Sequence, residues 1–185
     1  MVNDCVFLLP LYPNLIGGEL SMGKTITYTA VVKEMDSIQD LTALEQTLIS
    51  KAIDAAKTAY APYSRFNVGA SVLLENGKII SGNNQENVAY PSGLCAERVA
   101  LFAASANYPG VPVKAIAISA ISDHVSIGEL LSPCGACRQV MVEYEHRYQK
   151  NITLFLKGDT EKVYVVDSIG DILPFSFNSD KLKPK

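Results

Sequence analysis

The chain has 185 residues, of which 48% are hydrophobic and 19% charged, and its formal net charge is −3 at pH 7. This length and composition predict one globular domain with a sizeable core, and exclude a disordered chain or a small disulfide scaffold. The acidic balance argues against a general nucleic-acid-binding protein, which usually carries a basic face. Four cysteines, at positions 5, 95, 134 and 137, need an explanation.

The N-terminal residues differ from the rest of the chain. An apolar run at 6–11 is interrupted by Pro10 and has no basic residue before it. It is too short for a signal peptide or for a membrane helix of about 20 residues. We therefore expect residues 1–21 to be a flexible or spurious leader, 22–40 an extension and 41–185 the main domain. We expect a cytoplasmic protein without membrane contact.

Hydrophobic periodicity and turn residues predict alternating strands and helices along the chain. A capping box of Thr42 and Glu45 lies near the start of the first helix. Strands are expected at 25–33, 68–74, 78–82, 113–120, 152–156 and 163–166, and helices at 41–60, 95–106 and 134–147. This alternation predicts an α/β fold with a largely parallel sheet. The later two helices should begin at one sheet edge, where such folds bind ligands.

Three of the cysteines lie where those two helices begin. Cys134 and Cys137 belong to the sequence P-C-G-A-C, and an i, i+3 spacing allows both thiols to point the same way. A helix N-terminus favours thiolate, and Cys95 can supply a third ligand. Three ligands with an open fourth position are typical of catalytic zinc. The C-x-x-C pair by itself also fits a redox pair or two small core residues. Cys5 is interpreted as incidental.

Glu97 follows Cys95 by two residues and is the candidate catalytic group. A carboxylate beside a zinc site can accept a proton from water and pass it on. The alternative is that Glu97 only compensates the helix dipole, as acidic residues in a first turn often do.

The sequences C-A-E at 95–97 and P-C-G-A-C at 133–137 resemble the zinc-dependent cytidine deaminase family, whose motif is His or Cys before x-Glu and then Pro-Cys-x-x-Cys. The segments S-R-F-N-V-G-A at 64–70, N-Q-E-N at 84–87 and L-P-F-S-F at 173–177 also resemble it. The resemblance runs from about residue 48 to residue 177.

The resemblance implies a three-layer α/β/α fold with a mixed sheet of about five strands. It also implies hydrolytic deamination of cytidine and deoxycytidine, a step of pyrimidine salvage, with one zinc ion per subunit. Since the first ligand is Cys95 and not histidine, it points to the small homotetrameric type, with sites near subunit interfaces.

Further site residues follow from the resemblance. Asn84 and Glu86 match ribose contacts, which suits an amide and a carboxylate facing vicinal hydroxyls. Phe66 resembles a residue packed near the nucleoside, and Phe177 one that reaches a neighbouring subunit's site. Ala96 would contribute backbone groups to the base, and Arg98 would offset thiolate charge. The ordinary alternatives are a polar turn, two core phenylalanines and a surface arginine.

Three other functions remain open at this stage. One is deamination of another small nucleoside-like substrate, such as a nucleoside antibiotic. A second is a non-catalytic, zinc-stabilised interaction domain, in which Glu97 would be dispensable. A nucleic-acid cytosine deaminase is disfavoured because the chain lacks basic and aromatic platforms for a strand.

Overall fold

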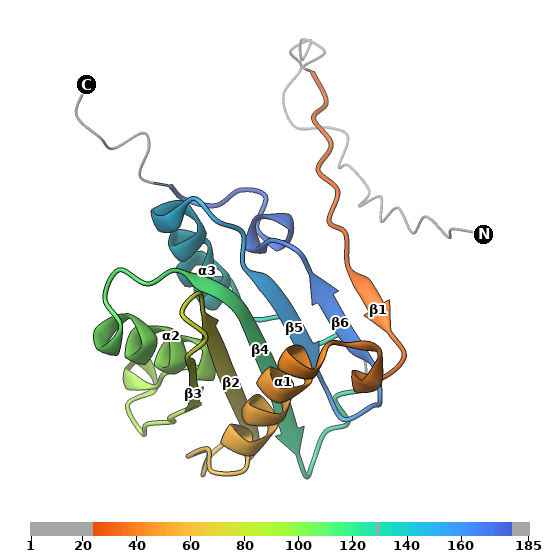
Figure 1. Cartoon of the computed structure of the whole chain (residues 1–185). Helices are drawn as coiled ribbons and strands as arrows, with labels where there is room; N and C mark the ends of the chain where they lie inside the picture. Colours follow the sequence, from red (N-terminus) through yellow and green to blue (C-terminus); the bar gives the residue numbers. More distant parts are fainter. Residues whose placement is uncertain (1–23, 129, 179–185) are drawn as a thin grey trace, which may run out of the picture.

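The computed structural model describes residues 24–128 and 130–178, so the predicted leader 1–21 and Cys5 lie outside the described part. Six strands, three α-helices and three short 3₁₀ helices (η) follow one another along these residues (Figure 1). In chain order they are β1 (Lys33–Met35), η1 (Ile38–Asp40), α1 (Ala43–Ala56), β2 (Phe66–Leu74), β3 (Ile79–Asn83), η2 (Tyr90–Ser92), α2 (Ala96–Asn107), β4 (Val113–Ser122), α3 (Gly135–Tyr148), β5 (Thr153–Lys157), β6 (Val163–Val166) and η3 (Ile169–Ile172).

The strands form one mixed sheet in the order β1-β6-β5-β4-β2-β3. Only the β4–β5 pair is parallel, and the other four pairs are antiparallel. The expectation of a largely parallel sheet is therefore wrong. The reason is that β2 pairs antiparallel with β4 as well as with β3, and that β6 returns antiparallel beside β5. Only α3 makes a crossover between two adjacent parallel strands. The sixth strand is β1, which lies at the edge beside β6.

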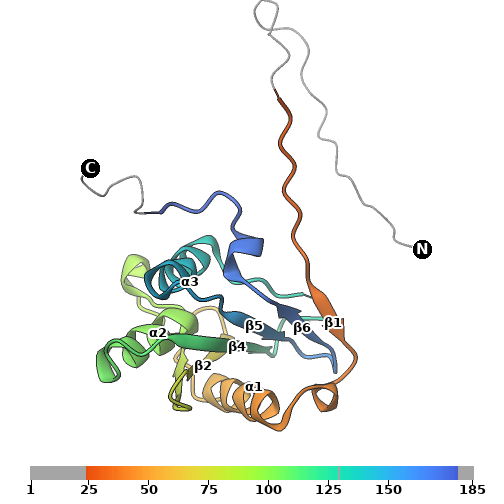
Figure 2. The ribbon, with the colours of Figure 1, turned by 45° about the horizontal axis from the view of Figure 1, so that its top comes forward.

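Helices cover both faces of the sheet, which confirms the three-layer α/β/α arrangement (Figure 2). On one face α1 contributes Leu48 to a cluster that also includes Ala115 and Phe155. On the other face α2 and α3 share a larger cluster with the alternate strand residues, such as Ile116 and Ile118. Because neighbouring strand residues point to opposite faces, β4 contributes its side chains to both clusters in turn.

Close approach of helix to strand explains two glycines in this core. A Cβ placed on Gly69 of β2 would lie 2.0 Å from Ala52 O of α1. A Cβ on Gly82 of β3 would lie 2.6 Å from Ala100 N of α2. Larger residues at these positions would push the helices off the sheet.

Local signals place the start of α1 correctly. Thr42 is the N-cap, and its side chain and that of Glu45 form the predicted capping box. The helix ends at Ala56, four residues earlier than expected. In the extension, the predicted strand at 25–33 is reduced to β1, and residues 24–32 have no regular secondary structure. None of the helices in the described residues is long and apolar enough to cross a membrane.

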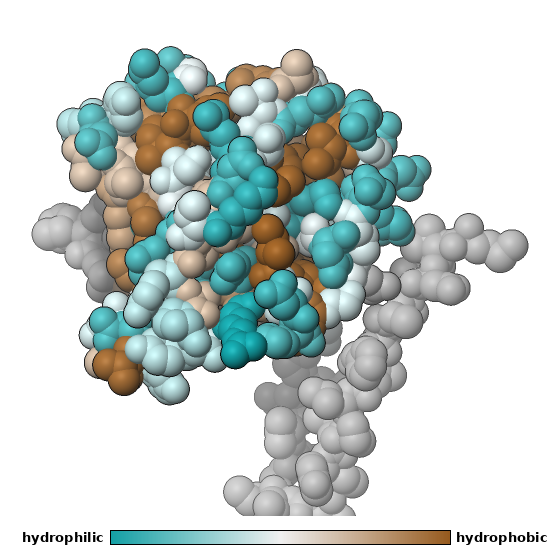
Figure 3. All heavy atoms as spheres, turned by 90° about the horizontal axis from the view of Figure 1, so that it is seen from below, coloured by the Kyte–Doolittle hydropathy of each residue, from teal (hydrophilic) through white to brown (hydrophobic). Residues whose placement is uncertain are grey.

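The site is expected at the end of the sheet where strands β3 and β4 finish. Both strands pair antiparallel with β2, so their carboxyl ends lie at the same end of the sheet. The chain enters α2 after β3 and α3 after β4, which brings the two helix N-termini together. The β4 arrow of Figure 1 points toward the bottom of the molecule. Figure 3 shows the molecule from that side, where polar and apolar side chains are mixed on the surface.

Candidate metal centre and substrate cavity

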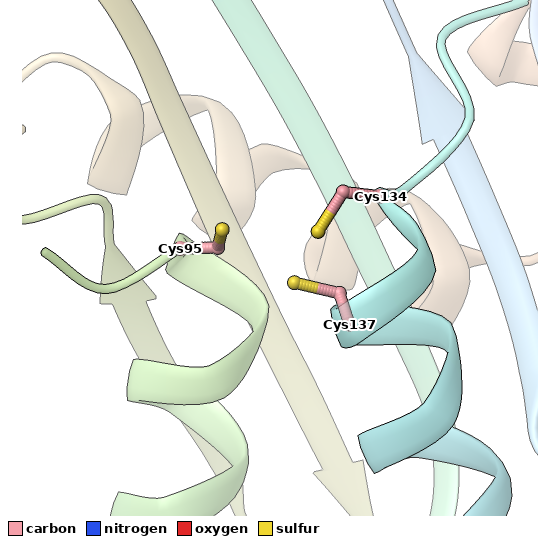
Figure 4. A group of neighbouring side chains, drawn as sticks. All are labelled: Cys95, Cys134 and Cys137. Carbon is pink, nitrogen blue, oxygen red and sulfur yellow. The ribbon is translucent and has the colours of Figure 1, made fainter. Parts of the chain in front are cut away.

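The three predicted ligands converge where α2 and α3 begin. Cys95 is the N-cap of α2, Cys134 is the N-cap of α3, and Cys137 lies in the first turn of α3. Their sulfur atoms all lie within 4.8 Å of one another, and Figure 4 shows the three thiols turned toward a common point. Cys137 is buried, Cys95 is half-buried and Cys134 is exposed. Protein on one side and access from the other suit a ligand set with an open position.

The chemistry of these donors fits zinc. Thiolate sulfur is a soft ligand, and a tetrahedral zinc site has Zn–S bonds of about 2.3 Å, which separates its sulfur atoms by about 3.8 Å. The thiol cluster therefore needs little contraction to hold the ion. The redox interpretation of Cys134 and Cys137 explains less, because it gives no role to Cys95.

The thiols of Cys95 and Cys137 differ in pKa. A hydrogen bond from Cys137 lowers the pKa of Cys95 to about 5, and Arg98 also contributes. The same hydrogen bond, together with burial, raises the pKa of Cys137. Arg98 donates from Nη2 to Cys95 Sγ at 3.7 Å, so it is directed at the ligand set as the resemblance implied. Its cationic form is stabilised by this contact, which raises the pKa of Arg98.

Glu97 is held next to the ligands in a nearly water-free position. It is 5% exposed, and this burial raises the pKa of its carboxyl group, with a smaller contribution from the negative charge of Cys95. A carboxyl group with a raised pKa exchanges protons more readily near neutral pH than an ordinary glutamate does. Dipole compensation at a helix start does not require burial, and the catalytic role of Glu97 stays a prediction.

A cavity of about 820 Å³ opens above the thiols. This volume lies in the range of small-molecule sites. Cys95, Ala96, Glu97, Arg98 and Cys134 line one part of it. Phe66, Asn84 and Glu86 belong to the same lining, as do Tyr63, Ser64, Tyr90 and residues 131–133. The cavity thus unites the metal centre with all but one of the predicted substrate contacts.

Asn84 and Glu86 lie in the wall of the cavity and are themselves fixed by the protein. Asn84 exchanges two hydrogen bonds with the backbone of β2 through its side-chain amide. Glu86 Oε2 accepts from Tyr63 N at 2.9 Å and from Ser64 N at 3.2 Å, while Ser64 Oγ donates to Oε1 at 2.5 Å. These hydrogen bonds lower the pKa of Glu86, and the bond from the Ser64 hydroxyl has the largest effect. The wall therefore carries an oriented carboxylate and an oriented amide.

Phe177 is the predicted site residue that the structure does not bring to this cavity. Its side chain is 70% exposed, and it is absent from the cavity lining formed by the described residues. Its backbone exchanges two hydrogen bonds with the side chain of Gln139 on α3. Its role toward another subunit's site stays a prediction.

Sequence reasoning did not single out the residues that hold the wall. Tyr63 and Ser64 position Glu86 from 23 and 22 residues away, a distance over which no local pattern is visible. The next residue, Arg65, has a φ of 52°, and its Nη1 lies 2.9 Å from His124 Nε2. A positive φ at a non-glycine residue marks a constrained backbone of the kind found at functional sites.

Comparison with known proteins gives a consistent result. A sequence model of the family described as "cytidine and deoxycytidylate deaminase zinc-binding region" matches residues 42–152. The chain is 39% identical over 137 residues to a cytidine deaminase of Halalkalibacterium halodurans, covering 74% of this chain and 96% of that one. It is 36% identical over 141 residues to a cytidine deaminase of Mycobacterium tuberculosis, covering 73% and 90%.

The fold is similar to solved structures of the same kind. The 1.6 Å crystal structure of cytidine deaminase from Burkholderia pseudomallei superposes with a TM-score of 0.62 at 40% identity, covering 74% of this chain and all of that one. The M. tuberculosis enzyme gives a TM-score of 0.55 at 36% identity, covering 71% of this chain and 95% of that one. About a quarter of this chain therefore lies outside the superposition with the B. pseudomallei structure.

Proposed function

We propose, because the chain belongs to the cytidine and deoxycytidylate deaminase family with its zinc-binding region, that it hydrolyses the exocyclic amine of cytidine and deoxycytidine. The products are uridine or deoxyuridine and ammonia. The observation that carries this proposal is the clustering of three cysteine thiols beside a cavity of nucleoside size, which Cys95, Cys134 and the buried Glu97 line.

Cys95, Cys134 and Cys137 would hold the zinc ion, which when bound would supply a nucleophilic water at neutral pH, because zinc lowers the pKa of such a water to about 7. Glu97 accepts a proton from the attacking water and delivers it to N3 of the pyrimidine ring, which makes C4 more electrophilic. Glu97 then moves the proton of the hydroxyl group added at C4 to the exocyclic amine, which leaves as ammonia, so that one carboxyl group acts as base and as acid. Arg98 offsets the negative charge of three thiolates, which would otherwise oppose loss of the water proton.

The part of the wall that carries Asn84 and Glu86 binds the sugar. Glu86 accepts from a ribose hydroxyl, and Asn84 offers both a donor and an acceptor to the same end of the substrate. Phe66 supplies an apolar surface for the nucleoside, while the backbone of Ala96 faces the base. Among the described residues that line the cavity, Arg98 is the only cation, and its guanidinium is directed at Cys95. The cavity therefore favours an unphosphorylated nucleoside over a nucleotide.

The assembly and context are part of the same proposal. Residues 41–185 form the deaminase domain and 22–40 an extension to it. The chain assembles as a homotetramer in which Phe177 reaches a neighbouring site, and it works in pyrimidine salvage in the cytoplasm. The exposed position of Phe177 supports this assembly, since the residue has no place in the cavity of its own chain.

The test is an assay of full-length, zinc-loaded protein on cytidine, deoxycytidine, their 5′-monophosphates and a modified nucleoside, followed by absorbance. We expect turnover of both nucleosides, its loss after chelation and its return with zinc. Turnover restricted to a monophosphate or to the modified nucleoside would overturn the proposed substrate class. Zinc binding without turnover of any of them would point to the interaction domain instead.

A further inference from the structure

Residues 24–32, here called the N-terminal arm, extend away from the body of the protein (Figures 1 and 2). The base of the arm is fixed by β1, which pairs with β6 in antiparallel register. Two ion pairs support this pairing, Lys33 with Asp167 at 2.6 Å and Lys162 with Glu34 at 2.5 Å. The family match begins at residue 42, so both the arm and β1 precede it.

The arm contacts the other end of the described chain through one aromatic pair. The rings of Tyr28 and Phe175 meet edge to face, with centroids 4.8 Å apart and planes at 60°. Both rings are otherwise largely exposed, Phe175 at 79% and Tyr28 at 54%. Residues 25–32 include no charged side chain. The contact therefore joins the N-terminal arm to the segment that follows η3.

The segment that follows η3 is also held from α3. Arg138 Nη1 donates to Ile172 O at 2.8 Å. Gln139 Nε2 donates to Phe177 O at 2.7 Å, and Phe177 N donates to Gln139 Oε1 at 3.1 Å. Arg138 and Gln139 directly follow the ligand Cys137, so the position of Phe177 is tied to the helix that carries the metal centre.

We propose that Tyr28 is a positioning residue for the reaction: through Phe175, the N-terminal arm holds residues 173–178 so that Phe177 is presented to the substrate site of a second copy of this chain. This inference rests on the proposed function, because it uses the role proposed for Phe177. Its physical basis is pre-organisation. A segment already held by Tyr28 and Gln139 loses less conformational freedom when Phe177 docks.

The test compares Tyr28→Ala with Tyr28→Phe in the full-length, zinc-loaded protein, and uses Ile26→Ala as the matched control. Ile26 lies on the same arm and is 67% exposed. We expect Tyr28→Ala to speed amide hydrogen exchange at residues 175–178. It should also raise KM for cytidine about threefold to tenfold, the range an aromatic pair contributes, with kcat nearly unchanged. Tyr28→Phe and Ile26→Ala should behave like the unmodified protein.

A double-mutant cycle with Phe177→Leu separates positioning from general stability. If the arm acts through Phe177, Tyr28→Ala adds no further rise in KM in the Phe177→Leu background. Unchanged hydrogen exchange in Tyr28→Ala, or additive effects on KM, would overturn the inference. If the protein turns over no cytidine, the proposed function fails. Hydrogen exchange then still shows whether the arm holds the segment.

Discussion

Asn84 pairs with Val68 through both its backbone and its side chain. Asn84 N donates to Val68 O at 3.0 Å, and Val68 N donates to Asn84 Oδ1 at 2.7 Å. The side-chain amide of Asn84 makes a further hydrogen bond, in which Nδ2 donates to Phe66 O at 2.9 Å. The side chain thus continues the β2–β3 pairing one residue past the end of β3 and fixes the cavity wall.

This pairing makes Asn84 both a structural and a substrate residue. Asn84→Ala removes two hydrogen bonds to partly buried backbone groups, so we expect a loss of about 1–2 kcal/mol in the free energy of unfolding. KM for cytidine should rise as well. Asn84→Asp is the sharper comparison, because it keeps the acceptor for Val68 N and sets a carboxylate oxygen against Phe66 O. Denaturant unfolding and steady-state kinetics measure both effects. Wild-type stability in Asn84→Ala would contradict the structural role.

Glu86 gives a prediction on pH. Hydrogen bonds from Ser64 and from the backbone of Tyr63 hold the pKa of Glu86 below its usual value of 4.5. The folded protein therefore keeps this carboxylate charged where an unfolded chain would begin to protonate it. Its contribution to stability is present above the unfolded pKa and is lost as the pH falls through the lower, folded value. Between pH 5 and 8, ionisation of Glu86 should not change KM.

Carbon-13 NMR of the carboxyl groups measures this directly. The Glu86 resonance should titrate with a midpoint below 4.5, and Ser64→Ala should move that midpoint upward, because the Ser64 hydroxyl is the largest cause of the shift. A midpoint at or above 4.5 in the unmodified protein would rule out the hydrogen-bonded carboxylate as described.

Glu97 separates catalysis from metal binding. Glu97→Gln preserves the shape of the buried side chain and removes its ability to exchange a proton. We expect one zinc per chain to remain, with kcat reduced on the order of 10²–10⁴-fold. Elemental analysis and turnover on the same sample test both parts. Loss of zinc together with activity would assign Glu97 to the metal site, and retained turnover would remove it from the mechanism.

Arg98 should tune the metal centre without belonging to it. Its Nη2 lies 3.7 Å from Cys95 Sγ and offsets the charge of the ligands. Arg98→Gln is expected to weaken zinc binding about 10–100-fold, the usual effect of losing such a supporting contact. Arg98→Lys keeps the charge, so its zinc affinity should lie between those of the unmodified protein and of Arg98→Gln. Competition with a chromophoric chelator measures the affinity. Equal zinc affinity in all three proteins would place Arg98 outside the site.

The metal centre was predictable from sequence because its signals are local. The two helix starts that carry Cys95, Cys134 and Cys137 are marked by residues within a few positions of each ligand, and the edge of the sheet follows from strand and helix order. Strand direction was not predictable in the same way. It depends on which strands pair over long distances: β4 lies antiparallel beside β2, and β6 lies antiparallel beside β5, where a largely parallel sheet was expected.

Two further features have no sequence signal at all. Ser64 is hydrogen-bonded to Glu86, and the ring of Tyr28 contacts that of Phe175. Each of these interactions joins segments that are far apart in the chain. The resemblance named Glu86 and Phe177 but not the residues that position them. Those residues are set by tertiary packing, which no periodicity or short motif expresses.

Glu145 provides a prediction on stability that sequence reasoning did not raise. This carboxylate of α3 is only 7% exposed. Its oxygens accept from the backbone N–H groups of Ile152 at 2.7 Å, Ile169 at 2.9 Å and Gly170 at 3.3 Å. Ser168 Oγ donates to it as well, at 3.1 Å. One side chain therefore joins α3 to the start of β5 and to η3, from which the segment carrying Phe177 continues.

Removing this carboxylate leaves several buried donors without their acceptor. We expect Glu145→Ala to lower the free energy of unfolding by about 2–4 kcal/mol. Glu145→Gln, which keeps one acceptor oxygen, should cost less. Because η3 leads into residues 173–178, Glu145→Ala should also speed hydrogen exchange there while zinc stays bound. Glu143→Ala on the exposed face of α3 is the control. A Glu145→Ala protein as stable as that control would show that the network can be replaced by water.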